Sequence, residues 1–308
     1  MTWSLADMPD LTDRRALVTG VTSGLGETIA LELARAGAEV VLAARSEAKL
    51  DTVEADLRAQ LPQARLRRLV IDLADLGAVR RAAAEAAELG ELHLLVNNAG
   101  VMATPYHRTP DGFELQMATN HFGPFALTGL LMPTLVASGG GRVVNTSSQA
   151  HRLTLSAPLG DPRVERGHYS RWRAYAQSKL ADLLFTYELD RRLRDAGLPV
   201  SALAAHPGYA STGLMATGRT SGGGELNHAG RVLIGAFHLA GQSPRMGAMP
   251  TLMAATADLP GSTYVGPSGF AEMRGWPRIV RSRRLAHDPD VQRRLWEISE
   301  NATGVRYP

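Results

Sequence analysis

Short apolar runs alternate with amphipathic segments from residue 15 to residue 205. The apolar runs predict buried strands, and they lie at Arg15–Thr19, Glu39–Ala44, Leu66–Ile71, Leu92–Val96, Arg142–Thr146 and Val200–Ala205. The segments between them predict helices at Leu25–Arg35, Ser46–Gln60, Asp75–Leu89, Phe113–Val136 and Arg173–Ala196. Continuously apolar strands joined by helices indicate a parallel sheet that is covered on both faces. We therefore expect an α/β fold with one doubly wound parallel sheet of about seven strands.

The composition narrows the chemistry that such a fold can carry. The chain has no cysteine, which excludes disulfides, thiolate nucleophiles and cysteine-based zinc or iron–sulfur sites. Its nine histidines include no His-x-x-x-His pair, so no metal site is expected. The net charge is +3 with basic residues spread along the chain, so we expect no nucleic-acid partner. The chain has no apolar run of about 18 residues and no secretory signal, which predicts no membrane association and a cytoplasmic location.

A glycine-rich turn follows the first predicted strand, with the sequence Gly20-Val21-Thr22-Ser23-Gly24-Leu25-Gly26. Glycines permit a tight backbone and a close approach to phosphate, and the N-terminus of the next helix offers unpaired amides and a partial positive charge. The order of strand, turn and helix therefore predicts a Rossmann-type site for the pyrophosphate of a dinucleotide. The alternative is a glycine turn that only serves the packing of a helix on its strand.

The end of the second predicted strand indicates which dinucleotide is bound. Sites for NAD usually place an acidic residue there to accept bonds from the ribose hydroxyls. In this chain Ala44 fills that position and Arg45 follows it. Because a guanidinium can bind a 2′-phosphate with two hydrogen bonds, we predict NADP(H), with NAD as the less favoured cofactor. The alternative is an arginine that only faces solvent.

Tyr175 and Lys179 lie four positions apart in a predicted helix, so they project from the same face. A phenol beside an ammonium loses its proton more readily than a phenol in water. Together with the glycine turn, the pair predicts hydride transfer with a tyrosine as proton donor. Taken alone, the spacing would equally fit an ordinary amphipathic helix.

These motifs, in this order, resemble those of the short-chain dehydrogenase/reductase family. The matching elements run over nearly the whole chain: Thr19-Gly20-x-x-x-Gly24-x-Gly26, Asp72, Asn97-Asn98-Ala99-Gly100, Asn120, Ser147-Ser148, Tyr175-x-x-x-Lys179 and Pro207-Gly208. Finer details are similar to the branch that contains retinol dehydrogenases and the WW-domain oxidoreductase. They are the run from Asn120 to Thr128, the run from Ala174 to Leu180, and the ending Leu295 to Glu300.

The resemblance implies a catalytic role for four residues. Tyr175 is expected to act as general acid in reduction, and Lys179 to assist it and to hold the nicotinamide ribose. Ser148 is expected to hydrogen-bond the substrate oxygen, with its neighbour Ser147 directed into the fold. Asn120 resembles the residue that holds a water for a proton relay to Lys179.

The resemblance also implies a set of cofactor-binding residues. They are Gly20, Thr22, Ser23, Gly24, Leu25, Gly26, Arg45, Asp72, Leu73, Asn98, Ala99, Gly100, Tyr175, Lys179, Pro207, Gly208 and Thr212. Asp72 and Asn98 have a simpler alternative as polar residues at a turn or a strand end. Tyr169 lacks a lysine four positions on, so it is expected to line the substrate entrance or to pack there, and His206 is expected to be structural.

The sequence therefore predicts an NADP-dependent oxidoreductase that interconverts a carbonyl and an alcohol on an apolar small molecule. One alternative is an NADP-binding regulatory or scaffold protein without turnover, although such a protein would need few of the four catalytic residues. Another is an extended-type epimerase, which would need a larger C-terminal substrate domain than the roughly 100 residues after Pro207 provide.

No linker rich in proline, serine or charge divides the chain, so we expect one domain over residues 1–308. Residues 14–205 would form the dinucleotide-binding and catalytic core, and residues 206–308 a small substrate lid and the C-terminal region. Residues 211–245, with three consecutive glycines, are predicted to form the lid, and a small helix packed on the core is the alternative. A homodimer or homotetramer is expected.

Overall fold

The computed structural model describes residues 2–22, 24–163, 169–209 and 242–307. In these residues one sheet has eight strands in the order β3-β2-β1-β4-β5-β6-β7-β8. The strands are β1 (Arg15–Thr19), β2 (Glu39–Ala44), β3 (Leu66–Val70), β4 (Leu94–Asn97), β5 (Gly141–Thr146), β6 (Val200–Ala205), β7 (Tyr264–Pro267) and β8 (Pro277–Ile279). Strands β1 to β7 run parallel, and β8 pairs antiparallel with β7. The predicted doubly wound sheet is confirmed, with one antiparallel edge strand added.

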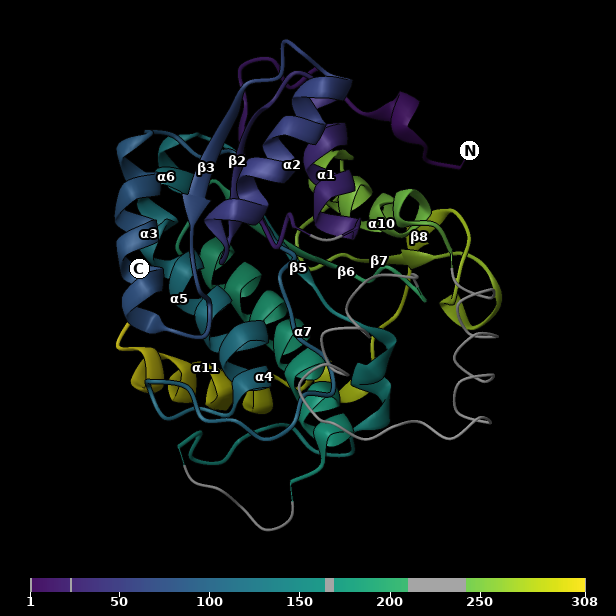
Figure 1. The fold of residues 1–308 in the computed structure, drawn as a ribbon. Coiled ribbons are helices and arrows are strands. Elements are labelled where there is room, and N and C mark those ends of the chain that lie inside the picture. Colours follow the sequence, from purple (N-terminus) through teal and green to yellow (C-terminus); the bar gives the residue numbers. More distant parts are fainter. Residues whose placement is uncertain (1, 23, 164–168, 210–241, 308) are drawn as a thin grey trace, which may run out of the picture.

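Helices cover both faces of the sheet (Figure 1). One face packs against α1 (Gly24–Arg35), α2 (Glu47–Gln60) and α10 (Pro244–Thr256). The other face packs against α3 (Leu76–Glu88), α5 (Gly123–Leu130), α6 (Met132–Ala137), α7 (Arg171–Asp195) and α11 (Pro289–Thr303). Short helical segments are η1 (Leu5–Asp7), α4 (Leu115–Met117), η2 (Ala118–Phe122), η3 (Gln149–Leu153), η4 (Phe270–Glu272) and η5 (Arg284–His287).

Local sequence explains where several helices begin and end. The Ser46 hydroxyl accepts a hydrogen bond from the Lys49 amide and caps α2, and the Asp75 carboxylate accepts two amides at the start of α3. Gly37 follows α1 with φ of 99°, a left-handed conformation in which most other residues are strained. These signals are local, which is why the ends of α1, α2 and α3 agree with the predicted ones to within about two residues.

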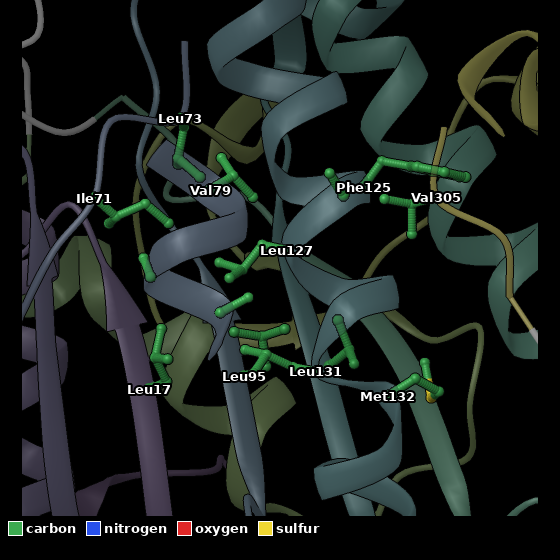
Figure 2. Packing of buried hydrophobic residues seen from close by; sticks show 14 of the residues in the cluster. Leu17, Ile71, Leu73, Val79, Leu95, Phe125, Leu127, Leu131, Met132 and Val305 are labelled. Carbon is green, nitrogen blue, oxygen red and sulfur yellow. The ribbon is translucent and has the colours of Figure 1, made fainter. Parts of the chain in front are cut away.

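The larger of the two main cores lies between the sheet and the α3, α5 and α11 side. In Figure 2, Leu17 of β1 and Leu95 of β4 face Leu127 and Leu131 across the cluster. Val305, which follows α11, packs on the same cluster although it is far away in sequence. The C-terminal residues therefore stabilise the helices that flank the site.

The single helix predicted over Phe113–Val136 is wrong, because the structure interrupts it twice. Residues 118–122 form η2, a π-helical turn that adds one residue to the helical repeat. Leu131 has φ of −91° and ψ of 0° and separates α5 from α6. Pro124 and Pro133 lie near the start of α5 and α6, where the lack of a backbone N–H costs nothing.

Strands β7 and β8 and helices α10 and α11 were not predicted from the sequence. β7 and β8 contain four and three residues and carry prolines, so their apolar pattern is too short to recognise. Residues 211–241 of the predicted lid lie outside the described residues. In the remaining part, Ser243 is the N-cap of α10.

Candidate active site

The carboxyl ends of β1, β4, β5 and β6 meet at one edge of the sheet. The strand order reverses between β1 and β4, and ligands of doubly wound sheets bind at such a switch point. The segments that leave the four strands here are Gly20 to Gly26, Asn98 to Gly100, Ser147 to Ser148 and His206 to Gly208. The parallel sheet thus brings most of the predicted site residues to one place.

The glycine turn after β1 packs directly against the end of β4. Gly20 has φ of 74°, and a Cβ on it would lie 2.7 Å from the Ala99 Cα. A Cβ on Gly26 would lie 2.2 Å from the Gly20 carbonyl oxygen. Both positions therefore require glycine because of close backbone contact. Thr22, Gly24 and Leu25 lie in the turn or the first turn of α1, and Ser23 is outside the described residues.

Asn98 and Ala99 are held by the residue before the glycine turn. The Asn98 side-chain amide donates to the Thr19 carbonyl oxygen at 2.9 Å. The Asn98 and Ala99 backbone amides both donate to Thr19 Oγ1 at 3.0 Å. These hydrogen bonds consequently join the ends of β1 and β4 beside the turn.

Arg45 and Asp72 lie at the ends of the two strands on the other side of β1. Arg45 is exposed, and none of the hydrogen bonds or ion pairs within the described ranges involves it. Its guanidinium is therefore available to an anion. Asp72 Oδ1 accepts the Ala74 amide at 2.9 Å, as a residue that shapes a turn does. Leu73 is buried, and its carbonyl oxygen would lie 2.3 Å from a Cβ on Gly123.

Tyr175 and Lys179 lie on one face of α7 and are buried. The Lys179 Nζ is 6.0 Å from the centre of the Tyr175 ring. Nζ donates to the Thr146 carbonyl oxygen at 2.8 Å and to Asp182 Oδ2 at 3.0 Å. Burial disfavours the ammonium, but the Asp182 carboxylate and Tyr175 outweigh burial and raise the pKa of Lys179. Lys179 is thus a cation near neutral pH.

Asn120 lies in the π-helical turn and is fixed from two sides. Its Oδ1 accepts the Val101 amide at 2.8 Å, and its Nδ2 donates to the Val101 carbonyl at 3.0 Å and to Ser178 Oγ at 2.9 Å. A Cβ on Gly100 would lie 3.2 Å from Asn120 Oδ1 and 3.6 Å from Lys179 Nζ. Gly100 therefore lies against both of these polar atoms.

The two adjacent serines after β5 have different surroundings. Ser147 is buried, and its hydroxyl donates to the Lys179 carbonyl oxygen at 2.7 Å, so it lies in the interior as expected. Ser148 is partly exposed and caps η3 by accepting the Ala150 amide at 3.2 Å. Its hydroxyl hydrogen has no acceptor among these contacts, so Ser148 can donate to a substrate oxygen.

Comparison with known proteins identifies the family. The family model of short-chain dehydrogenases matches residues 14–158. Retinol dehydrogenase 13 of Homo sapiens is 37% identical over 300 residues, which cover 96% of this chain and 86% of that protein. The chain belongs to the short-chain dehydrogenase/reductase family. It falls in the retinol dehydrogenase-like branch and is an NAD(P)-dependent oxidoreductase that acts on CH–OH groups.

Solved structures share the fold of this short-chain dehydrogenase. The crystal structure of an uncharacterized protein from Mycobacterium paratuberculosis matches over 100% of both chains, with a TM-score of 0.78 and 39% identity. An NAD(P)-dependent gluconate 5-dehydrogenase from Beutenbergia cavernae, with NADP bound at low occupancy, matches 80% of this chain and 91% of its own. That match has a TM-score of 0.61 and 27% identity.

A buried cluster beneath Pro207 and Gly208 of this short-chain dehydrogenase was not predicted. The Gly208 amide donates to His206 Nδ1 at 3.2 Å, so the ring proton lies on Nε2. Nε2 lies 3.0 Å from Glu272 Oε2 and donates to it. Burial lowers the pKa of His206 although Glu272 opposes this, so the ring is neutral at pH 7. Glu272, in a segment without a recognisable motif, thereby anchors the turn expected at the nicotinamide. Thr212 is outside the described residues.

Tyr169 is tied into a hydrogen-bond network away from Lys179. Its hydroxyl lies 2.8 Å from Glu114 Oε1 and 2.7 Å from Gln116 Nε2. Burial, followed by the Glu114 charge, raises the pKa of Tyr169, which makes it a poor proton donor. Its ring packs edge-on against Tyr106. Tyr169 therefore packs beside the start of α7.

In the described ranges of the chain, the helices are all too short or too polar to cross a bilayer. The same ranges hold no group of three or more His, Asp or Glu side chains placed to bind a metal ion.

Proposed function

We propose that the protein is an NADP-dependent oxidoreductase that interconverts a carbonyl and an alcohol on an apolar small molecule, with Tyr175 as general acid and base. The observation that carries this proposal is that Lys179 Nζ and Asn120 Oδ1 both lie against Gly100, in the segment that follows β4. Tyr175 lies on the same face of α7 as Lys179, whose Nζ is 6.0 Å from the centre of the Tyr175 ring. A binding-only protein would need few of the four catalytic residues.

The residues present fit the proposed cofactor. Gly20 and Gly26 bring backbone close together at the start of α1, where a pyrophosphate would meet free amides. The unpaired guanidinium of Arg45 supports a contact with the 2′-phosphate of NADP. Pro207 and Gly208, held through His206, would border the nicotinamide. When bound, the reduced nicotinamide supplies the hydride.

Each catalytic side chain has a distinct task in reduction. Tyr175 gives its proton to the carbonyl oxygen, and Ser148 holds that oxygen by donating a hydrogen bond. The Lys179 ammonium favours the phenolate that Tyr175 becomes. Asn120 is expected to hold a water for a proton relay to Lys179. In alcohol oxidation the same groups act in reverse.

An apolar substrate is supported by the surroundings of Tyr175. Trp172, one turn earlier on α7, is 55% exposed, and its ring centre lies 6.5 Å from that of Tyr175. An exposed indole at this position offers a flat apolar wall to a substrate. The similarity to a retinol dehydrogenase agrees with such a substrate.

The test is NADPH oxidation by the purified protein with a panel of aldehydes, ketones and quinones, including apolar polyenes. We expect turnover with at least one apolar carbonyl, and faster turnover with NADPH than with NADH. NADPH binding without turnover on any member of the panel would instead support the scaffold alternative.

A further inference from the structure

Asp182 lies one turn beyond Lys179 on α7 and pairs with it inside the protein. The two side chains are 6% and 5% exposed, and Asp182 Oδ2 is 3.0 Å from Lys179 Nζ. The ammonium has three hydrogens, and two of them point to Asp182 and to the Thr146 carbonyl oxygen. One hydrogen therefore remains for a group at the proposed active site.

The pair is electrically isolated from the other elements that pack on this part of α7. His121 of η2 and His151 of η3 are buried, which lowers their pKa values to about 3 and about 4, so both rings are neutral at pH 7. His206 at the end of β6 is neutral for the same reason. Tyr175 is the further group in the described residues whose charge acts on Lys179.

Several other charged groups near α7 have partners of their own. Glu114, before α4, caps that helix and contacts Tyr169. Glu272 of η4 contacts His206 and Arg152. Farther along α7 and in η5, the ion pairs and ring contacts are Glu188 with Arg191 and Arg192, Asp190 with Arg194, and Tyr187 with His287. The carboxylate of Asp182 is therefore the counter-charge of Lys179.

We propose that Asp182 is a positioning residue, which fixes the Lys179 ammonium and offsets its electrostatic effect on Tyr175. This inference rests on the proposed roles of Tyr175 and Lys179. A lone ammonium favours the phenolate strongly, whereas an ammonium with a carboxylate 3.0 Å away favours it less, because the two charges partly cancel. Asp182 thereby moves the ionisation of Tyr175 to higher pH.

The offset depends on Asp182 being ionised. Burial raises the pKa of Asp182 to about 6, although Lys179 acts in the opposite direction. At about pH 6 half of the carboxyl groups are therefore ionised, and the offset becomes complete only well above this pH. Below this pH the proton on Asp182 removes the offset, and wild type should approach a variant without the charge.

The test replaces Asp182 by asparagine, which keeps the shape and one acceptor oxygen but removes the charge. Ionisation of Tyr175 is followed by the ultraviolet absorbance of its phenolate with NADP⁺ present, as the difference from Tyr175→Phe in the same background. We expect the midpoint in Asp182→Asn to fall by about one pH unit. The acid limb of alcohol oxidation should fall by the same amount, because the phenolate accepts the alcohol proton.

Asp190→Asn is the matched control, because Asp190 is another buried aspartate of α7. It binds Arg194, Ser262 and the Ala202 amide, and it lies eight residues from Asp182. This variant should lose stability without moving the midpoint. An equal shift in Asp190→Asn, or an unchanged or higher midpoint in Asp182→Asn, would overturn the proposal.

A second variant and a readout that needs no substrate keep the result decisive. If Asp182→Asn does not fold, Asp182→Ser is titrated in the same way, since it also removes the charge and retains an acceptor. The absorbance titration needs no substrate, so it reads the Asp182 effect even in a protein without turnover. Failure of the carbonyl panel would contradict the proposed function alone, whereas an unmoved midpoint would contradict the role of Asp182 alone.

Discussion

The turn after β1 and the middle of α7 reach the same edge of the sheet, but different forces hold them there. In the turn, backbone atoms are so close that Gly20 and Gly26 leave no room for a side chain. In α7, Lys179 is held by a carboxylate and a carbonyl oxygen. Changes of side-chain volume should therefore damage the turn, whereas loss of a charge or a proton should damage the function of the helix.

The largest effect is expected for Tyr175→Phe, which removes a proton and almost no volume. Turnover should fall by a factor of about 100 or more, the usual contribution of a general acid. NADPH affinity, measured by fluorescence titration, should stay nearly unchanged. If more than about a tenth of the rate remains, the proton comes from another group and the helix is not the charge-controlled region.

Gly26→Ala tests the volume-controlled region. The new Cβ would lie 2.2 Å from the Gly20 carbonyl oxygen, so the turn must move, at a cost of about 1–3 kcal/mol. We expect a lower urea midpoint and weaker NADPH binding. Gly140→Ala is the control, because a Cβ on Gly140 has no atom within 4 Å. Equal behaviour of the two variants would show that close packing at Gly26 is unimportant.

Ala44→Asp combined with Arg45→Ala tests whether the charges at the end of β2 select the cofactor. Hydrogen bonds to a charged group contribute about 1.5–3 kcal/mol, so the ratio of kcat/KM for NADPH to that for NADH should fall roughly tenfold or more. Steady-state kinetics with both cofactors measures the ratio. A ratio that barely moves would mean that Arg45 does not contact the 2′-phosphate.

The smallest effect is expected for Glu272→Gln, which keeps an acceptor for His206 but removes the charge. Charge-assisted hydrogen bonds are about twice as strong as neutral ones, so the KM for NADPH should rise only a few-fold. Glu300→Gln is the control, because Glu300 has a similar exposure but pairs with Arg306 near the C-terminus. A change in kcat without a change in KM would place Glu272 with the catalytic groups of α7.

The sequence predicts best those features that local pattern decides. Short strand-like runs between the predicted helices located β1 to β6, and α7 was expected at 173–196 and is found at 171–195. The π-helical turn at Asn120 was not predictable, because it goes with hydrogen bonds to Val101 that form only in the folded chain. Asp182 was overlooked for a related reason. An acid three residues after a lysine usually marks an exposed helix face, and only tertiary packing buries this pair.

The two outermost strands of the sheet, β3 and β8 in Figure 1, limit how copies of this chain can associate. The outer strand β3 exposes Arg67 and Arg68, and the opposite edge is β8, which has three residues and starts with Pro277. Arginines and a short, proline-started edge discourage a second chain from adding a strand. Pairing through the sheet edges is therefore disfavoured, and so is the strand-by-strand aggregation that exposed edges promote. Assembly of this enzyme should use its helical faces instead.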